Sequence, residues 1–83
     1  MTLEQLKAYR FHIRHPTAEG FADMAAVEHF VRGVPDEYIR RMISAYYLDG
    51  LTWSEVCTFC CPYLLPDCCR IIVKRYLKTL GVE

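Results

Sequence analysis

Basic side chains recur at intervals of four near the end of the chain, at Arg70, Lys74 and Lys78. In a helix this spacing places them on one face, opposite an apolar stripe. Arginine can bind guanine through two hydrogen bonds, and lysine can neutralise a phosphate. The pattern therefore indicates recognition of a polyanion. An ordinary solvent-exposed helix face has the same pattern, so that second interpretation stays open.

The five cysteines form a second group of candidate residues. Cys57, Cys60 and Cys61, together with Cys68 and Cys69, could in principle supply four thiolates to zinc. In a helix, however, Cys57 and Cys60 share the face that must pack against the last helix. Cysteine without activation behaves as a small buried apolar residue. We therefore expect free thiols, with a zinc-stabilised domain as the third-ranked alternative.

No group of residues indicates catalysis. The sequence has no nucleophile elbow, no glycine loop for phosphate and no paired-carboxylate site. His12, His15 and His29 stand at no recognisable metal-ligand spacing. We expect a protein that is not an enzyme, with no cofactor, no bound metal and no small-molecule substrate.

The composition limits the class of protein. The chain has 83 residues, of which 53% are hydrophobic and 24% charged, so we expect one helical domain over residues 1–83. Ten basic and ten acidic residues give zero net charge, which argues against a histone-like protein that binds by bulk charge. We find no secretory signal and no apolar run of membrane-spanning length. We therefore expect a cytoplasmic protein with reduced thiols and no membrane partner.

Helical periodicity accounts for most of the sequence, and no segment alternates with period two. A capping box at residues 2–5 predicts a first helix to about residue 14, where His15-Pro16 ends it. A second helix is expected from about residue 17 to the stop at Gly33. A third begins near residues 35–37 and ends at Asp49-Gly50. The expected fold is all-α, a four- to five-helix bundle.

The last part of the chain, at about residues 52–80, predicts a helix-turn-helix. A second capping box at residues 52–55 begins a short helix that ends near Cys61-Pro62. Cys61 stands where such turns often have glycine, and a left-handed backbone there would be costly for cysteine. Pro66 suits the first position of the final helix. We expect its inner face to consist of Cys69, Ile72, Val73, Tyr76, Leu77 and Leu80.

Residues 34–78 resemble small phage-associated helix-turn-helix proteins related to region 4 of sigma factors. The most specific match is Tyr-x-Asp-Gly-x-Thr-Trp at residues 47–53. The other matching pieces are Asp36, Arg40-Arg41, Glu55-Val56 and the stretch from Asp67 to Leu77. The resemblance implies a DNA-binding protein that regulates transcription, with the last helix as the reader.

We therefore expect double-stranded DNA as the partner, with RNA polymerase or a second copy of the chain as further candidates. Asp67 and Ile71 would lie near base edges. The cations expected to contact DNA are Arg70, Lys74, Arg75 and Lys78, and Arg40 and Arg41 could add phosphate contacts from the third helix.

The alternative function belongs to another class. The apolar pair Leu64-Leu65 lies in a turn that would face DNA, and the net charge is zero. Both features favour a protein-protein interaction module that has the helix-turn-helix shape and does not bind DNA.

Overall fold

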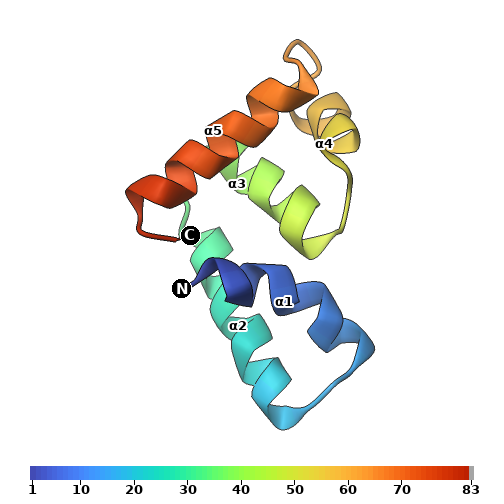
Figure 1. Ribbon diagram of the computed structural model, residues 1–83, viewed down its shortest axis with the longest axis vertical. Helices are drawn as coiled ribbons and strands as arrows, with labels where there is room; N and C mark the ends of the chain where they lie inside the picture. Colours follow the sequence, from blue (N-terminus) through green and yellow to red (C-terminus); the bar gives the residue numbers. More distant parts are fainter. Residues whose placement is uncertain (83) are drawn as a thin grey trace.

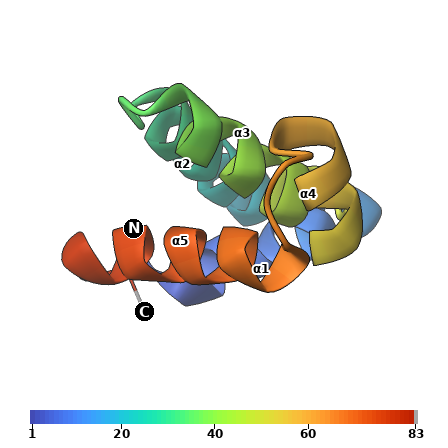
Figure 2. The ribbon, with the colours of Figure 1, turned by 90° about the horizontal axis from the view of Figure 1, so that it is seen from above.

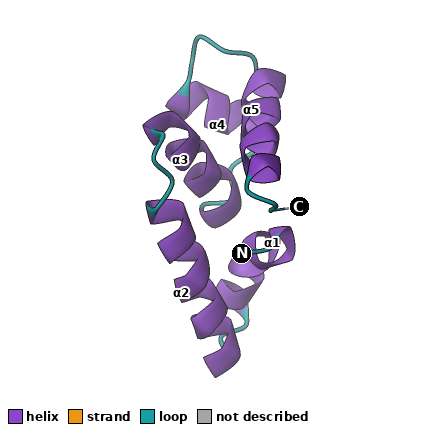
Figure 3. Ribbon diagram, turned by 90° about the vertical axis from the view of Figure 1, so that its left-hand side faces the viewer, coloured by secondary structure: helices purple, strands orange, loops and turns teal. Residues whose placement is uncertain are grey.

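Helices account for most of the chain in the computed structural model, which describes residues 1–82 (Figure 1). No strand occurs in this part of the chain, so the all-α prediction is confirmed (Figure 3). The elements in chain order are α1 (Leu3–Arg14), α2 (Ala18–Arg32), α3 (Glu37–Ile43), η1 (Ser44–Leu48), α4 (Trp53–Cys60) and α5 (Pro66–Thr79).

Both predicted capping boxes are present. The Thr2 hydroxyl accepts a hydrogen bond of 3.2 Å from the Gln5 N–H, and the Gln5 side chain accepts one of 2.9 Å from the Thr2 N–H. Thr52 and Glu55 repeat this exchange at the start of α4, over 3.3 and 3.0 Å. The Thr52 backbone N–H lowers the pKa of Glu55 by stabilising its carboxylate. The two helices therefore begin where the sequence predicts.

The third predicted helix is divided into two segments with different windings. α3 is followed by η1, a π-helical turn in which the Asp49 N–H donates to the Ser44 carbonyl over 3.0 Å. The wider turn brings successive side chains closer to one face than an α-helix does. Tyr46 and Tyr47 are consecutive, yet both face the same groove.

The helices form two tiers that share one hydrophobic core (Figure 1). α1 and α2 form an antiparallel pair, joined by a hydrogen bond of 2.7 Å from the Tyr9 hydroxyl to Glu28. α3, α4 and α5 form the other tier, and α1 packs against η1 between them. Leu6, Val27 and Val73 are completely buried in this core, although they belong to different tiers.

α4 and α5 form the helix-turn-helix, and residues 61–65 connect them. Cys61 has φ of −144°, so the steric cost of a left-handed backbone, noted above for cysteine at this position, does not arise. Pro66 is the first residue of α5, as predicted. Seen from above, α5 lies along one edge of the molecule, on the side away from α2 (Figure 2).

Leu80 does not belong to the inner face of α5 as predicted, because it is 50% exposed. The helix ends at Thr79, and Gly81 takes a left-handed conformation with φ of +73°. The Val82 N–H then donates to the Leu77 carbonyl over 2.9 Å, which is the long bond of a Schellman motif. The chain reverses at Gly81, and Val82 takes the buried position.

Among the described helices, none is both long and apolar enough to cross a bilayer.

Candidate functional site

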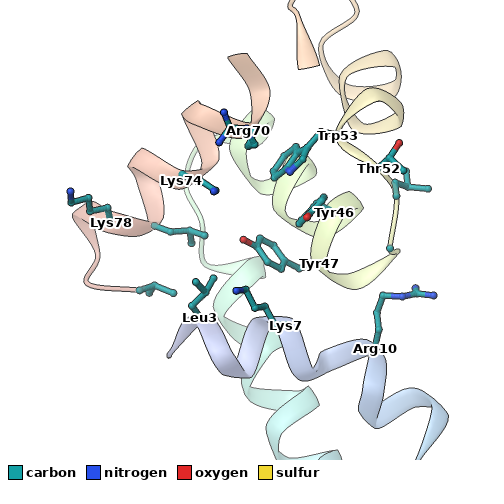
Figure 4. Close-up of a pocket in the computed structure, with 14 residues that line it drawn as sticks. Leu3, Lys7, Arg10, Tyr46, Tyr47, Thr52, Trp53, Arg70, Lys74 and Lys78 are labelled. Carbon is teal, nitrogen blue, oxygen red and sulfur yellow. The ribbon is translucent and has the colours of Figure 1, made fainter. Parts of the chain in front are cut away.

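A groove of about 1070 Å³ lies between α1 and α5 (Figure 4). Its floor comes from η1, the connection after it and the start of α4, so segments far apart in the sequence build it. The residues that line it are Leu3, Lys7, Arg10, Tyr46, Tyr47, Gly50, Leu51, Thr52, Trp53, Arg70, Lys74, Leu77, Lys78 and Val82.

The charge of the groove has one sign. All three lysines of the chain line it, together with Arg10 and Arg70. Of the acidic residues among positions 1–82, none lines it. Half of the ten basic residues therefore gather in one place in a chain whose net charge is zero. Like charges in such proximity repel, and an anionic partner would offset that repulsion.

The α5 wall carries three of the predicted cations. Lys74 and Lys78 are exposed, and Arg70 is partly exposed. Arg70 Nε lies 3.5 Å from Asp67 Oδ1, one turn earlier on the same helix. That pair is in contact with solvent, so it only partly offsets the Arg70 charge. The three predicted cations Arg70, Lys74 and Lys78 therefore lie together on the groove.

The α1 wall carries two cations that the sequence interpretation missed, Lys7 and Arg10. Arg10 donates a hydrogen bond of 3.3 Å to the Leu48 carbonyl and lies against Gly50. Lys7 is exposed, and it takes part in none of the ion pairs within residues 1–82. The spacing of Lys7 and Arg10 places both near one side of a helix. This spacing is visible in the sequence, but it does not indicate that α5 lies opposite these two cations.

Aromatic rings form the floor. Trp53 stacks on Tyr46 with ring centroids 4.0 Å apart and an angle of 13° between their planes. Tyr46 meets Tyr47 edge to face at 4.9 Å. Burial raises the pKa of Tyr47, and the neighbouring Tyr46 raises it further. Trp53 is partly buried: it packs against the hydrophobic core and also lines the groove.

Five other predicted site residues lie outside the groove. Ile71 and Arg75 are exposed on α5, as is Asp67, and none of these three lines the groove. Arg40 donates a hydrogen bond of 3.0 Å to the Val34 carbonyl, and Arg41 pairs with Glu37 over 2.6 Å. Arg40 and Arg41 line a smaller depression elsewhere on the molecule.

All five cysteines are free thiols, and three of them, Cys57, Cys61 and Cys69, are buried. The Cys57 thiol donates to the Leu64 carbonyl, which ties the turn to α4. Burial and hydrogen bonding to Cys57 raise the pKa of Cys69 to about 12. Within residues 1–82, no group of three or more His, Cys, Asp or Glu side chains is placed to hold a metal ion.

The end of α4 and the turn that follows it carry exposed apolar side chains. Phe59 and Tyr63 are each 73% exposed and Leu65 is 70% exposed, whereas Leu64 packs against the core. We refer to Phe59, Tyr63 and Leu65 as the turn patch.

No protein-family model matches this chain, and neither a curated protein nor a solved structure is significantly similar to it. The groove and the turn patch are therefore interpreted from their own residues.

Proposed function

We propose that this chain is a helix-turn-helix DNA-binding protein that acts in transcription regulation, in the manner of the sigma-region-4-like proteins that it resembles. In this proposal α5 enters the major groove of a duplex. Arg70, Lys74 and Lys78 contact the DNA from one flank of α5, and Asp67, Ile71 and Arg75 lie on its outer side.

The observation that carries the proposal is the concentration of cations beside α5. All three lysines and two arginines line one groove, and no acidic residue among positions 1–82 joins them. A neutral chain has no bulk attraction for nucleic acid, so its affinity would depend on such a local excess. The edge position of α5 supports the proposal, because a reading helix must protrude to reach base edges.

The double variant Arg70→Ala with Lys74→Ala tests the proposal. Each lost phosphate contact lowers the slope of log K against log salt concentration by about 0.9, so we expect a decrease of about 1.8. Fluorescence anisotropy of labelled random-sequence duplexes, titrated with the protein at several salt concentrations, measures this slope.

The matched control is Arg14→Ala with Arg32→Ala. Both arginines are exposed and neither lines the groove, so this variant loses the same charge elsewhere. We expect its slope to equal that of the parent chain. If the folded groove variant binds like the parent, or if both variants lose the same amount, α5 is not the DNA-binding element.

The second candidate function is protein-protein interaction without DNA binding, and the turn patch is the observation that favours it. Three large apolar side chains at least 70% exposed, within seven residues of the chain at the end of α4 and in the turn after it, are unusual for a surface with no partner. Self-association or polymerase binding, in a chain without affinity for duplex DNA, would favour this second candidate.

A further inference from the structure

We propose that the groove holds the sugar-phosphate strand that borders the α5-occupied major groove, and that Lys7 of α1 is a phosphate contact from the opposite wall. This inference rests on the proposed function and assigns α1 to the same site.

The dimensions of the α5 wall suit a strand. Arg70, Lys74 and Lys78 follow one another by four residues, which is about 6 Å per step along a helix. That interval is close to the spacing of neighbouring phosphates along a nucleic-acid strand. A row of cations at this interval can meet successive phosphates, whereas a single small anion would use only one of them.

The opposite wall is fixed in position. α1 packs against η1, and its residue Leu6 is completely buried. Figure 4 shows Lys7 rising from α1 and Lys74 extending from α5 into the space between the two helices. No ion pair within residues 1–82 includes either ammonium group. Two unpaired ammonium groups that face one space are arranged to share an anionic strand.

The floor suits the less polar part of a strand. Between its phosphates a nucleic-acid backbone exposes sugars, and the partly exposed rings of Tyr46 and Trp53 offer an apolar surface to them. Arg10 adds positive charge on the α1 wall, where its side chain donates a hydrogen bond to the Leu48 carbonyl. The groove thus combines charged walls with an apolar floor, which suits a backbone in which charged phosphates alternate with less polar sugars.

The variant Lys7→Ala tests the inference, and Arg14→Ala is its control on the same helix. Arg14 is exposed and lies two turns farther along α1, outside the groove. We expect Lys7→Ala to lower the salt slope for duplex binding by about 0.9 and to weaken binding up to about eightfold at 0.1 M salt. Arg14→Ala should leave the slope unchanged, and Lys7→Arg should preserve it.

Trp53 provides a second readout, because it is the only tryptophan and lies on the groove floor. We expect its fluorescence to change when duplex DNA saturates the protein. If Arg70→Ala with Lys74→Ala lowers the slope but Lys7→Ala does not, the proposed function stands and the inference about α1 is wrong. Unchanged Trp53 emission at saturation would also overturn the inference. If the parent chain shows no salt-dependent binding to a duplex, both proposals are wrong.

Discussion

At the scale of single residues, the hydrogen bond between Tyr9 and Glu28 links α1 to α2 and so holds one wall of the groove. The Tyr9 hydroxyl donates to Glu28 Oε1 over 2.7 Å. This bond, and then burial, raise the pKa of Tyr9 from 10.0 to about 12. Because the folded value lies above the unfolded one, the contribution of this residue to stability is complete below about pH 10. It is lost as the pH rises through about 12.

Replacement of Tyr9 by Phe removes this bond and leaves the ring. We expect the free energy of unfolding to fall by about 1.5 kcal/mol at neutral pH, as for a hydrogen bond to a charged group. The difference between parent and variant should shrink above about pH 10, because the parent then loses its advantage. Urea unfolding at about pH 8 and about pH 11 measures both effects. A difference that stays constant over this range would contradict the assignment.

At the scale of elements, the connection between η1 and α4 depends on Gly50. Its φ is +74°, and a Cβ atom there would lie 2.5 Å from Nε and Cζ of Arg10. Gly81 has nearly the same backbone, with φ of +73°, but a Cβ there would meet no described atom within 4 Å. Substitution of either glycine strains the backbone, but only a substitution at Gly50 also displaces a neighbouring side chain. A comparison of the two variants therefore separates the two effects.

Replacement of either glycine by Ala should cost about 1–2 kcal/mol through the left-handed backbone. Gly50→Ala should cost about 1 kcal/mol more, because it also displaces Arg10 from its hydrogen bond with the Leu48 carbonyl. Urea unfolding of the two variants beside the parent measures the difference. Equal costs would show that Arg10 adjusts freely around the new methyl group.

The elements were more predictable than the site that they build. Thr2 and Thr52 cap helices, and a capping box depends on only four consecutive residues. The preference of proline for the first position of a helix, seen at Pro66, is equally local. Arg70, Lys74 and Lys78 could be placed on one face because the spacing within one helix suffices. Lys7 could not be joined to them, because the approach of α1 to α5 depends on packing between distant segments. The π-helical turn at η1 has no sequence signal that we could identify.

At the scale of the whole molecule, the first two helices are part of the core. Leu6 and Val27 are completely buried in the same cluster as Val56 and Val73 of the helix-turn-helix. A domain of this size has a total stability of roughly 5 kcal/mol. The free-energy cost of a single cavity in the shared core is therefore comparable with the total stability.

Leu6→Ala should cost about 2–5 kcal/mol and leave a large fraction of the chain unfolded at 25 °C. Phe11→Ala is the control on the same helix, since Phe11 is 59% exposed and its loss should change stability by less than about 0.5 kcal/mol. Circular dichroism during thermal unfolding compares the two. A cooperative Leu6→Ala transition near that of the parent would show that the helix-turn-helix folds without α1.

The placement of the lysines has a consequence for how the molecule moves in an electric field. Residues 1–82 outside the groove hold five basic and nine acidic side chains, an excess of four negative charges opposed to the five positive ones within it. The positive charge is thus concentrated in one groove while the net charge of the molecule is zero, so the attraction to a charged partner depends on orientation. The electric field of a nucleic-acid duplex would therefore rotate the protein, groove first, before the protein reaches the duplex. Salt would weaken this torque once the screening length falls below the width of the molecule.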